Sequence, residues 1–325
     1  MQFTDDIRIY DFEFNLIQQT NTYNSASWSL KYNDAGTFEG HFPISVDIVP
    51  LIMGNDYLVI AQGENAAIIT GRQAGTDFAV FGRTCNWILS RRVTPDFDQL
   101  TGTAETLTRG FVQTAFADVE DFVLGPEFGL SKELKFWRNT YNPTLDVVTD
   151  CLAEDGAGHR VVFDTKNKQW VYQVYKGQEL PLIISEANKN AYDTEITDDC
   201  LDFYTGGWYE QKSEPQEGET DGGSTWIYIP GVSEKTGIYR WECTLSGSNE
   251  SEAKSSLQTK RRKNETAVKS RDLILGRDYG LGDIVRVQIQ KGQYQTTVKK
   301  RITGVNIRYE QGGTGQQPVF SDLEG

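Results

Sequence analysis

The residues that could carry out chemistry in this sequence are few and widely spaced. Histidine is the commonest general base and a frequent metal ligand, and the chain contains only His41 and His159. A Ser–His–Asp or Cys–His site would have to use one of them, and Cys151 lies eight residues before His159. A helix end and glycines are expected between these two side chains, and no HExxH motif is present. The sequence therefore favours structural or surface roles for both histidines and predicts no catalytic residue.

The acidic segment YDTEITDDCLD, residues 192–202, is the strongest candidate for a metal site. Its carboxylates are oxygen ligands of the kind that calcium prefers: Asp193, Glu195, Asp198, Asp199 and Asp202. The loop glycine and the terminal glutamate of an EF-hand are missing at the required offsets. We therefore favour a solvated acidic edge over a calcium site and predict no metal and no cofactor. A carboxylate pair for glycoside hydrolysis stays open, because that mechanism depends on spatial separation.

Two glycine-rich segments and one basic cluster complete the candidates. GRQAGTD (71–77) and GGTGQQP (312–318) lack the GK[ST] ending of a phosphate loop, so both predict turns. The basic cluster runs from Lys260 to Arg271. It would either contact phosphate or an acidic partner, or form a solvated helix face that balances nearby acid. The second interpretation is favoured because the whole chain is acidic.

Composition limits the class of protein. The chain has 325 residues, 38% of them hydrophobic, and a net charge of −14. A core can be buried, and the acidic surface argues against general nucleic-acid binding. No apolar run is long enough to cross a bilayer, and the N-terminus has no signal-peptide pattern. The cysteines lie far apart without a CxxC pair, as expected of isolated thiols made in a reducing cytoplasm: Cys85, Cys151, Cys200 and Cys243.

Hydrophobic periodicity predicts the elements that would position these residues. A hairpin is expected over 28–45, where Trp28 to Tyr32 and Phe38 to Phe42 alternate with polar residues. Its connection contains Asp34 and Gly36, which we expect to adopt positive φ. Strands over the rest of residues 1–95 make this region β-rich.

The hydrophobic periodicity changes after residue 95. Helices are predicted over 103–122 and 143–156, the second with Pro143 in its first turn and Gly156 at its end. Strands follow over 159–177 and dominate again after about residue 180. Residues 210–224 predict a solvated loop, and residues 251–270 predict a polar helix. The fold class is thus α+β and dominated by β-strands.

In this order, the motifs resemble those of the tail hub proteins of long-tailed phages, prophages and phage-tail-like particles, also called baseplate hub or tail-associated (Tal-like) proteins. The matching segments are YNDAGTFEGHFPI, AAIITGRQAGTDFAVFGRTCNWILSRRV, TLTRGFVQTAF, NPTLDVVTDCLAEDGAGHRVVFD, GIYRWECTL, YGLGDIVRVQI, RITGVNIRY and GQQPVF. The turn residues that match the family are Asn33, Asp34, Gly36, Gly82, Tyr279, Gly282 and Asp283.

The resemblance implies a tail-hub fold with three modules. Residues 1–95 would form a first β-barrel-like module and residues 96–178 a mixed α/β module. Residues 179–325 would form a second barrel-like module, with the acidic loop 210–224 and a helical insert at about 250–270. Both barrel-like modules would be antiparallel.

The resemblance also implies partners and a location. Three copies would form a ring that joins the hexameric tail tube or the distal tail protein to a trimeric tip, spike or fibre. The protein would lie in the virion tail, would be made in the host bacterial cytoplasm, and would bind no membrane itself. DNA would only pass through the ring, and acidic residues facing the lumen would keep it from adhering.

Two other functions remain as alternatives. The Trp and Tyr content in β-rich surroundings suggests a carbohydrate- or receptor-binding tail module. A cell-wall hydrolase is suggested only by the domains that many relatives carry as extensions. Because the sequence ends at Gly325 without such an extension, a non-enzymatic role is expected.

Overall fold

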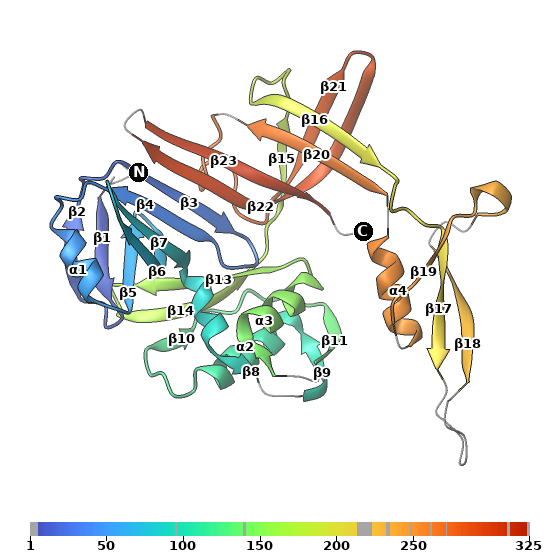
Figure 1. Ribbon diagram of the computed structural model, residues 1–325, viewed down its shortest axis with the longest axis horizontal. Coiled ribbons are helices and arrows are strands. Elements are labelled where there is room, and N and C mark those ends of the chain that lie inside the picture. The colour runs from blue at the N-terminus through green and yellow to red at the C-terminus, as the bar shows by residue number, and fades with distance from the viewer. Residues whose placement is uncertain are drawn as a thin grey trace. The chain divides into compact units, whose positions relative to one another are not determined.

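The chain divides into two compact units in a computed structural model (Figure 1). Unit 1 comprises Met1–Asp193 and Val268–Gly325, and unit 2 comprises Thr194–Ala267. The structure describes residues 6–94, 97–138, 141–212, 223–231, 235–247, 249–260, 262–270, 272–310 and 313–323.

An 11-stranded sheet forms the larger part of unit 1 (Figure 1). Its strands are β1 (Ile7–Asp11), β2 (Leu16–Thr20), β3 (Ser25–Lys31), β4 (Thr37–Phe42), β5 (Leu58–Gln62), β6 (Asn65–Ala74), β7 (Phe78–Thr84), β15 (Glu179–Ile184), β21 (Ile284–Lys291), β22 (Tyr294–Glu310) and β23 (Gly313–Asp322). The strand order is β15-β21-β22-β3-β4-β7-β6-β5-β1-β2, and β23 pairs with β22. A short helix, α1 (Ile48–Gly54), lies between β4 and β5 in the chain.

The long strand β22 joins the two ends of the chain in this sheet. Its residues 304–310 pair with β3 on one edge and with β23 on the other, whereas its residues 294–301 pair with β21. The N-terminal and C-terminal strands that the sequence assigns to separate modules therefore share one sheet. Among the described strands, β15 and β2 lie at opposite ends of the strand order and do not pair with each other, so the sheet does not close into a barrel. The prediction of a β-dominated α+β fold is confirmed.

The first predicted hairpin is β3 and β4, and it forms part of the core. Trp28 pairs with Phe38 in the antiparallel register, and their ring centroids are 4.5 Å apart. The Trp28 indole Nε1 donates a hydrogen bond of 2.8 Å to the buried Gln62 side chain. The polar tip of this buried tryptophan is thus satisfied, as burial of an indole requires.

A mixed module lies between the two sets of sheet strands. Its elements are η1 (Cys85–Arg91), β8 (Val93–Thr94), β9 (Phe97–Thr103), α2 (Ala104–Ala115), β10 (Phe122–Leu124), β11 (Glu133–Arg138), β12 (Asn142–Pro143), α3 (Thr144–Ala153), β13 (Gly158–Asp164) and β14 (Gln169–Tyr175). The Thr103 hydroxyl caps α2 by accepting a hydrogen bond from the Thr106 N–H. Pro143 precedes α3 instead of lying in its first turn, and Gly156 follows its end with φ +59°.

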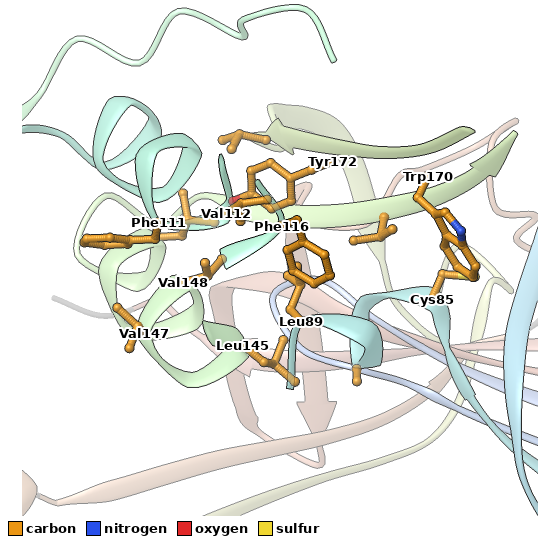
Figure 2. Packing of buried hydrophobic residues seen from close by; sticks show 14 of the residues in the cluster. Cys85, Leu89, Phe111, Val112, Phe116, Leu145, Val147, Val148, Trp170 and Tyr172 are labelled. Carbon is orange, nitrogen blue, oxygen red and sulfur yellow. The ribbon is translucent and has the colours of Figure 1, made fainter. Parts of the chain in front are cut away.

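The helices α2 and α3 pack through buried apolar side chains. Phe111 and Val112 of α2 and Val148 of α3 lie in one buried cluster with Leu89 of η1 (Figure 2). Leu107 of α2 belongs to the same cluster. Figure 2 also shows Trp170 and Tyr172 of β14 in this cluster. The core of this module therefore lies between α2, α3, η1 and the β13–β14 hairpin.

Unit 2 contains a three-stranded sheet with one helix packed on it. The sheet contains β17 (Gly206–Lys212), β18 (Ser224–Pro230) and β19 (Glu242–Thr244), with η2 (Gly237–Tyr239) between β18 and β19. The helix α4 (Glu250–Thr259) buries Ala253 and Leu257 in a cluster with Tyr209, Ile229 and Leu245.

Two predictions for this part of the chain need correction. The helix expected over 251–270 ends at Thr259, and residues 263–270 form a strand, β20 (Lys263–Ser270). This strand pairs with β16 (Ala191–Asp199), so its polar residues satisfy their backbone groups in a sheet and not in a helix. The loop expected over 210–224 is shorter, because Glu210–Lys212 belong to β17 and β18 begins at Ser224. Residues 213–222 of that loop lie outside the described residues.

Candidate functional site

The connection between β3 and β4 holds three of the motif residues and bonds to the mixed module. The Asn33 amide donates a hydrogen bond of 2.8 Å to the Thr149 carbonyl of α3. The Asn33 Oδ1 lies 3.0 Å from the Nδ1 of His159 on β13. The Asp34 backbone carbonyl accepts a hydrogen bond of 2.9 Å from the Asn86 amide. This connection therefore ties the sheet to the mixed module within unit 1.

Gly36 and Gly82 are glycines because a side chain would not fit, and not because a turn needs positive φ. Neither Asp34 nor Gly36 has a positive φ, so that prediction is wrong. A Cβ at Gly36 would lie 1.9 Å from the Ser29 carbonyl oxygen, and the residue is a glycine because there is no room. Gly82 lies inside β7 and not at a turn, and a Cβ there would lie 2.9 Å from the Ile68 carbonyl.

The other motif residues lie in the segment that leads into β21. Gly282 has φ +89°, and its N–H donates a hydrogen bond of 2.7 Å to the Ile302 carbonyl. The Asp283 carboxylate accepts hydrogen bonds from the backbone N–H groups of Gln178 and Gly280 at 2.9 and 2.7 Å. Tyr279 is buried beside this segment, and its hydroxyl has no hydrogen-bond partner among the described residues.

Tyr32 brings these two groups of motif residues together. Its side chain is buried, and its hydroxyl donates a hydrogen bond of 3.0 Å to the Gly156 carbonyl. A Cβ at Gly282 would lie 2.2 Å from the Tyr32 ring, and the Arg301 guanidinium lies 5.6 Å from the ring centroid. Burial raises the pKa of the Tyr32 hydroxyl. We call this contact of Tyr32 with Gly156, Gly282 and Arg301 the Tyr32 junction.

The sequence pattern did not single out Tyr32 as the centre of this site. It marked Tyr32 only as one of several alternating residues of a strand. Gly158 and Gly282 surround its ring, and both leave room for it because they lack a Cβ. These glycines are distant from Tyr32 in the sequence, so only the folded structure shows that they meet it.

The two histidines make different contacts. His41 on β4 is partly exposed, with its ring nitrogens 3.0 Å from Glu39 and 2.8 Å from Asp77. Hydrogen bonds to Glu39 and then to Asp77 raise the pKa of His41. His159 is buried, and desolvation lowers its pKa to about 3, so its imidazole is neutral at pH 7.

The four cysteines are free thiols. Cys85 and Cys151 are buried, and burial raises the pKa of both thiols to about 12. Cys151 Sγ lies 4.0 Å from the Ala104 carbonyl, whereas His159 faces Asn33. The thiol and the imidazole thus have separate partners.

The acidic segment and the basic cluster lie on paired strands. Asp193 on β16 forms an ion pair of 2.5 Å with Lys269 on β20. Asp198 forms an ion pair with Arg262 just before β20. Hydrogen bonds to these cations lower the pKa of both aspartates. The two charged segments therefore neutralise each other in part. The basic cluster balances nearby acid as expected, but the residues at its end lie on a strand and not on a helix face.

Neither a metal site nor a membrane span is found in the described part of the chain. No group of three or more His, Cys, Asp or Glu residues there could hold a metal ion. No helix there is long and apolar enough to cross a membrane. Arg271 and Arg261 of the basic cluster lie outside the described residues.

Comparison with known proteins identifies the family. The model of the siphovirus ReqiPepy6 Gp37-like protein family matches residues 6–216. No curated protein matches the chain.

Several solved structures share the fold over almost the whole chain. A 43 kDa tail protein of prophage MuSo2 from Shewanella oneidensis has a TM-score of 0.59 at 8% identity, covering 98% of each chain. A tail protein from Neisseria meningitidis has a TM-score of 0.58 at 10% identity, covering 97% of this chain and 96% of that one. The prophage tail protein gp18 from Listeria monocytogenes has a TM-score of 0.56 at 14% identity, covering 98% and 95%.

These matches confirm the resemblance to phage tail proteins that the sequence motifs suggested. The family model covers well over half of the chain, and the structural matches extend through the C-terminal strands. The chain therefore belongs to the siphovirus ReqiPepy6 Gp37-like protein family, and its fold is that of phage tail proteins.

Proposed function

We propose that this chain is a structural tail hub protein whose three copies form a ring. The ring joins the hexameric tail tube or distal tail protein to the trimeric tip, spike or fibre. The observation that carries the proposal is the coverage of the structural matches, which extend over nearly the full length of this chain and of prophage tail proteins.

The arrangement of strands in unit 1 supports a ring of this kind. One set of sheet strands, β1–β7, comes from the proposed first module (1–95), and β15 and β21–β23 come from the proposed third module (179–325). The mixed module (96–178) lies between them in the chain. Three copies would carry six β-rich parts, and such a ring could match six tube subunits on one side and three tip subunits on the other.

Strand edges give the copies a means of pairing. β2, with the sequence LIQQT, pairs only with β1 among the described strands and contains neither charge nor proline. An edge strand without these protective features is open to pairing with another chain. Pairing between copies would complete the barrel-like closure that the described strands of one chain do not make.

The proposed location is the virion tail, after synthesis in the host cytoplasm. The chain carries 46 acidic and 32 basic residues, so a lumen lined by this protein would repel the phosphates of passing DNA. DNA is therefore proposed to pass through the ring without stable binding. The proposed role is structural and not enzymatic.

The mass of the purified protein tests this proposal. We expect light scattering over a range of concentrations to give a stable species at three times 36.6 kDa, because hidden strand edges favour a closed assembly. Negative-stain microscopy should show that species as a ring. A chain that stays monomeric both alone and with its tube or distal tail protein would contradict the hub role.

A further inference from the structure

The sheet of unit 2 has one covered face and one open face. Tyr209, Ile229 and Leu245 point toward α4 and are buried. Trp208 pairs directly with Tyr228, and Glu210 pairs with Trp226, so the two tryptophans and Tyr228 share the opposite face. Trp208 and Trp226 are 38% and 50% exposed there. We call Trp208, Trp226, Tyr228, Arg240 and Glu242 the aromatic face.

Several of these side chains are held in position by contacts within unit 2. The Trp208 indole Nε1 donates a hydrogen bond of 2.9 Å to Glu242, and its ring centroid lies 5.2 Å from that of Tyr228. The Arg240 guanidinium lies 4.6 Å from the Tyr228 ring centroid and donates a hydrogen bond of 2.5 Å to Glu242. A surface fixed in this way loses little conformational entropy when a ligand binds.

The charges of the aromatic face favour an uncharged ligand. Arg240 and Glu242 neutralise each other beside the rings. Acidic residues outnumber basic ones in residues 194–267, so the unit repels nucleic acids and other anionic polymers. Protein–protein interfaces are enriched in Trp, Tyr and Arg but depleted of Glu, whereas here the Glu242 carboxylate lies beside the rings and accepts from Trp208 and Arg240.

A saccharide fits these features better than a protein surface does. A pyranose ring presents a face of C–H groups that can stack on an indole or phenol ring. Its hydroxyl groups can accept hydrogen bonds from the unused N–H groups of a guanidinium and donate them to the free lone pairs of a carboxylate. We propose that the aromatic face binds an uncharged, pyranose-containing polysaccharide of the host cell surface. This inference does not depend on the hub role.

Titration of the whole protein with defined hexasaccharides tests the proposal. Chitohexaose, cellohexaose and maltohexaose serve as uncharged probes, and hexagalacturonate serves as the anionic control. We expect at least one uncharged probe to bind and to change tryptophan fluorescence, while the anionic control does not bind. Trp226→Ala should weaken that binding at least about tenfold, the size of effect typical of an exposed aromatic anchor.

Two further variants test whether the loss of binding comes from the loss of an aromatic ring at position 226. Trp226→Phe keeps an aromatic ring and should retain most of the binding. Tyr294→Ala removes another exposed aromatic residue, in unit 1, and should leave binding unchanged. Circular dichroism shows whether each variant is folded.

Three results would overturn the proposal. The first is the absence of binding by all three uncharged probes up to about 10 mM, the limit of weak specific affinity. The second is equal binding by folded Trp226→Ala and the unaltered protein. The third is a Trp226→Ala variant whose mass by light scattering changes while no probe binds, because the face would then contact protein.

Discussion

Replacing Gly282 by alanine is expected to destabilise unit 1 by roughly 3 kcal/mol, through positive φ and overpacking together. Gly282 has φ +89°, and a Cβ there would lie 2.2 Å from the buried Tyr32 ring. The ring has little freedom to move, because the Tyr32 hydroxyl bonds to Gly156 and Arg301 covers its face. Equilibrium denaturation in urea, followed by near-ultraviolet circular dichroism, measures the loss of stability.

Gly292 provides the matched control for this prediction. It has φ +62° in the β21–β22 hairpin, and a Cβ there would meet nothing within 4 Å. Gly292→Ala should therefore cost only the positive-φ strain, about 1 kcal/mol. In a Tyr32→Ala background, Gly282→Ala should cost no more than Gly292→Ala, because the overlap with the ring is gone. Equal losses for the two glycine variants in the unaltered background would refute the packing explanation.

The elements predicted correctly are those that local patterns determine. The β3–β4 hairpin alternates between buried and more exposed positions. Gly63 supplies the positive φ of the turn between β5 and β6. The helix α2 shows apolar residues at three- and four-residue spacings together with a threonine cap. Each of these signals lies within one helix or one hairpin.

The features that escaped prediction depend on contacts between distant segments. Pairing of β22 with β3 joins the two ends of the chain, and no local pattern specifies that register. The polar sequence of β20 is compatible with a helix, and its pairing with β16 makes it a strand. The same pairing places the acidic segment beside the basic cluster, and so the ion pairs Asp193–Lys269 and Asp198–Arg262 could not be foreseen.

Acid should destabilise the protein through His159 in particular. The Asn33 amide donates to the Thr149 carbonyl, so the Asn33 Oδ1 is its accepting atom and His159 Nδ1 carries the proton. The Nε2 of His159 is then unprotonated, and it is buried without a hydrogen-bond partner among the described residues. Protonation there would bury an unpaired cation, which explains why the pKa of His159 falls from 6.5 to about 3.

The sign of the pH dependence follows from this lowered pKa. Between pH 6.5 and about 3, the unfolded state binds a proton at His159 and the folded state does not. The contribution of His159 to stability is thus complete above pH 6.5 and is lost as the pH falls. At pH 5 the free energy of unfolding should be about 2 kcal/mol lower than at pH 8 through this residue alone.

A comparison with two histidine variants isolates the effect from the titration of carboxylates. His159→Gln keeps a donor for Asn33 but cannot be protonated, so its free energy of unfolding should decline less steeply than that of the unaltered protein from pH 7 to pH 5. His41→Gln should have the opposite effect, because the pKa of His41 is raised and its contribution is lost only as the pH increases through that pKa. Parallel stability curves for the unaltered protein and His159→Gln would mean that water or a rearranged loop reaches Nε2. In that case the contact between Asn33 and His159 would not be the buried link that holds the β3–β4 connection to the mixed module.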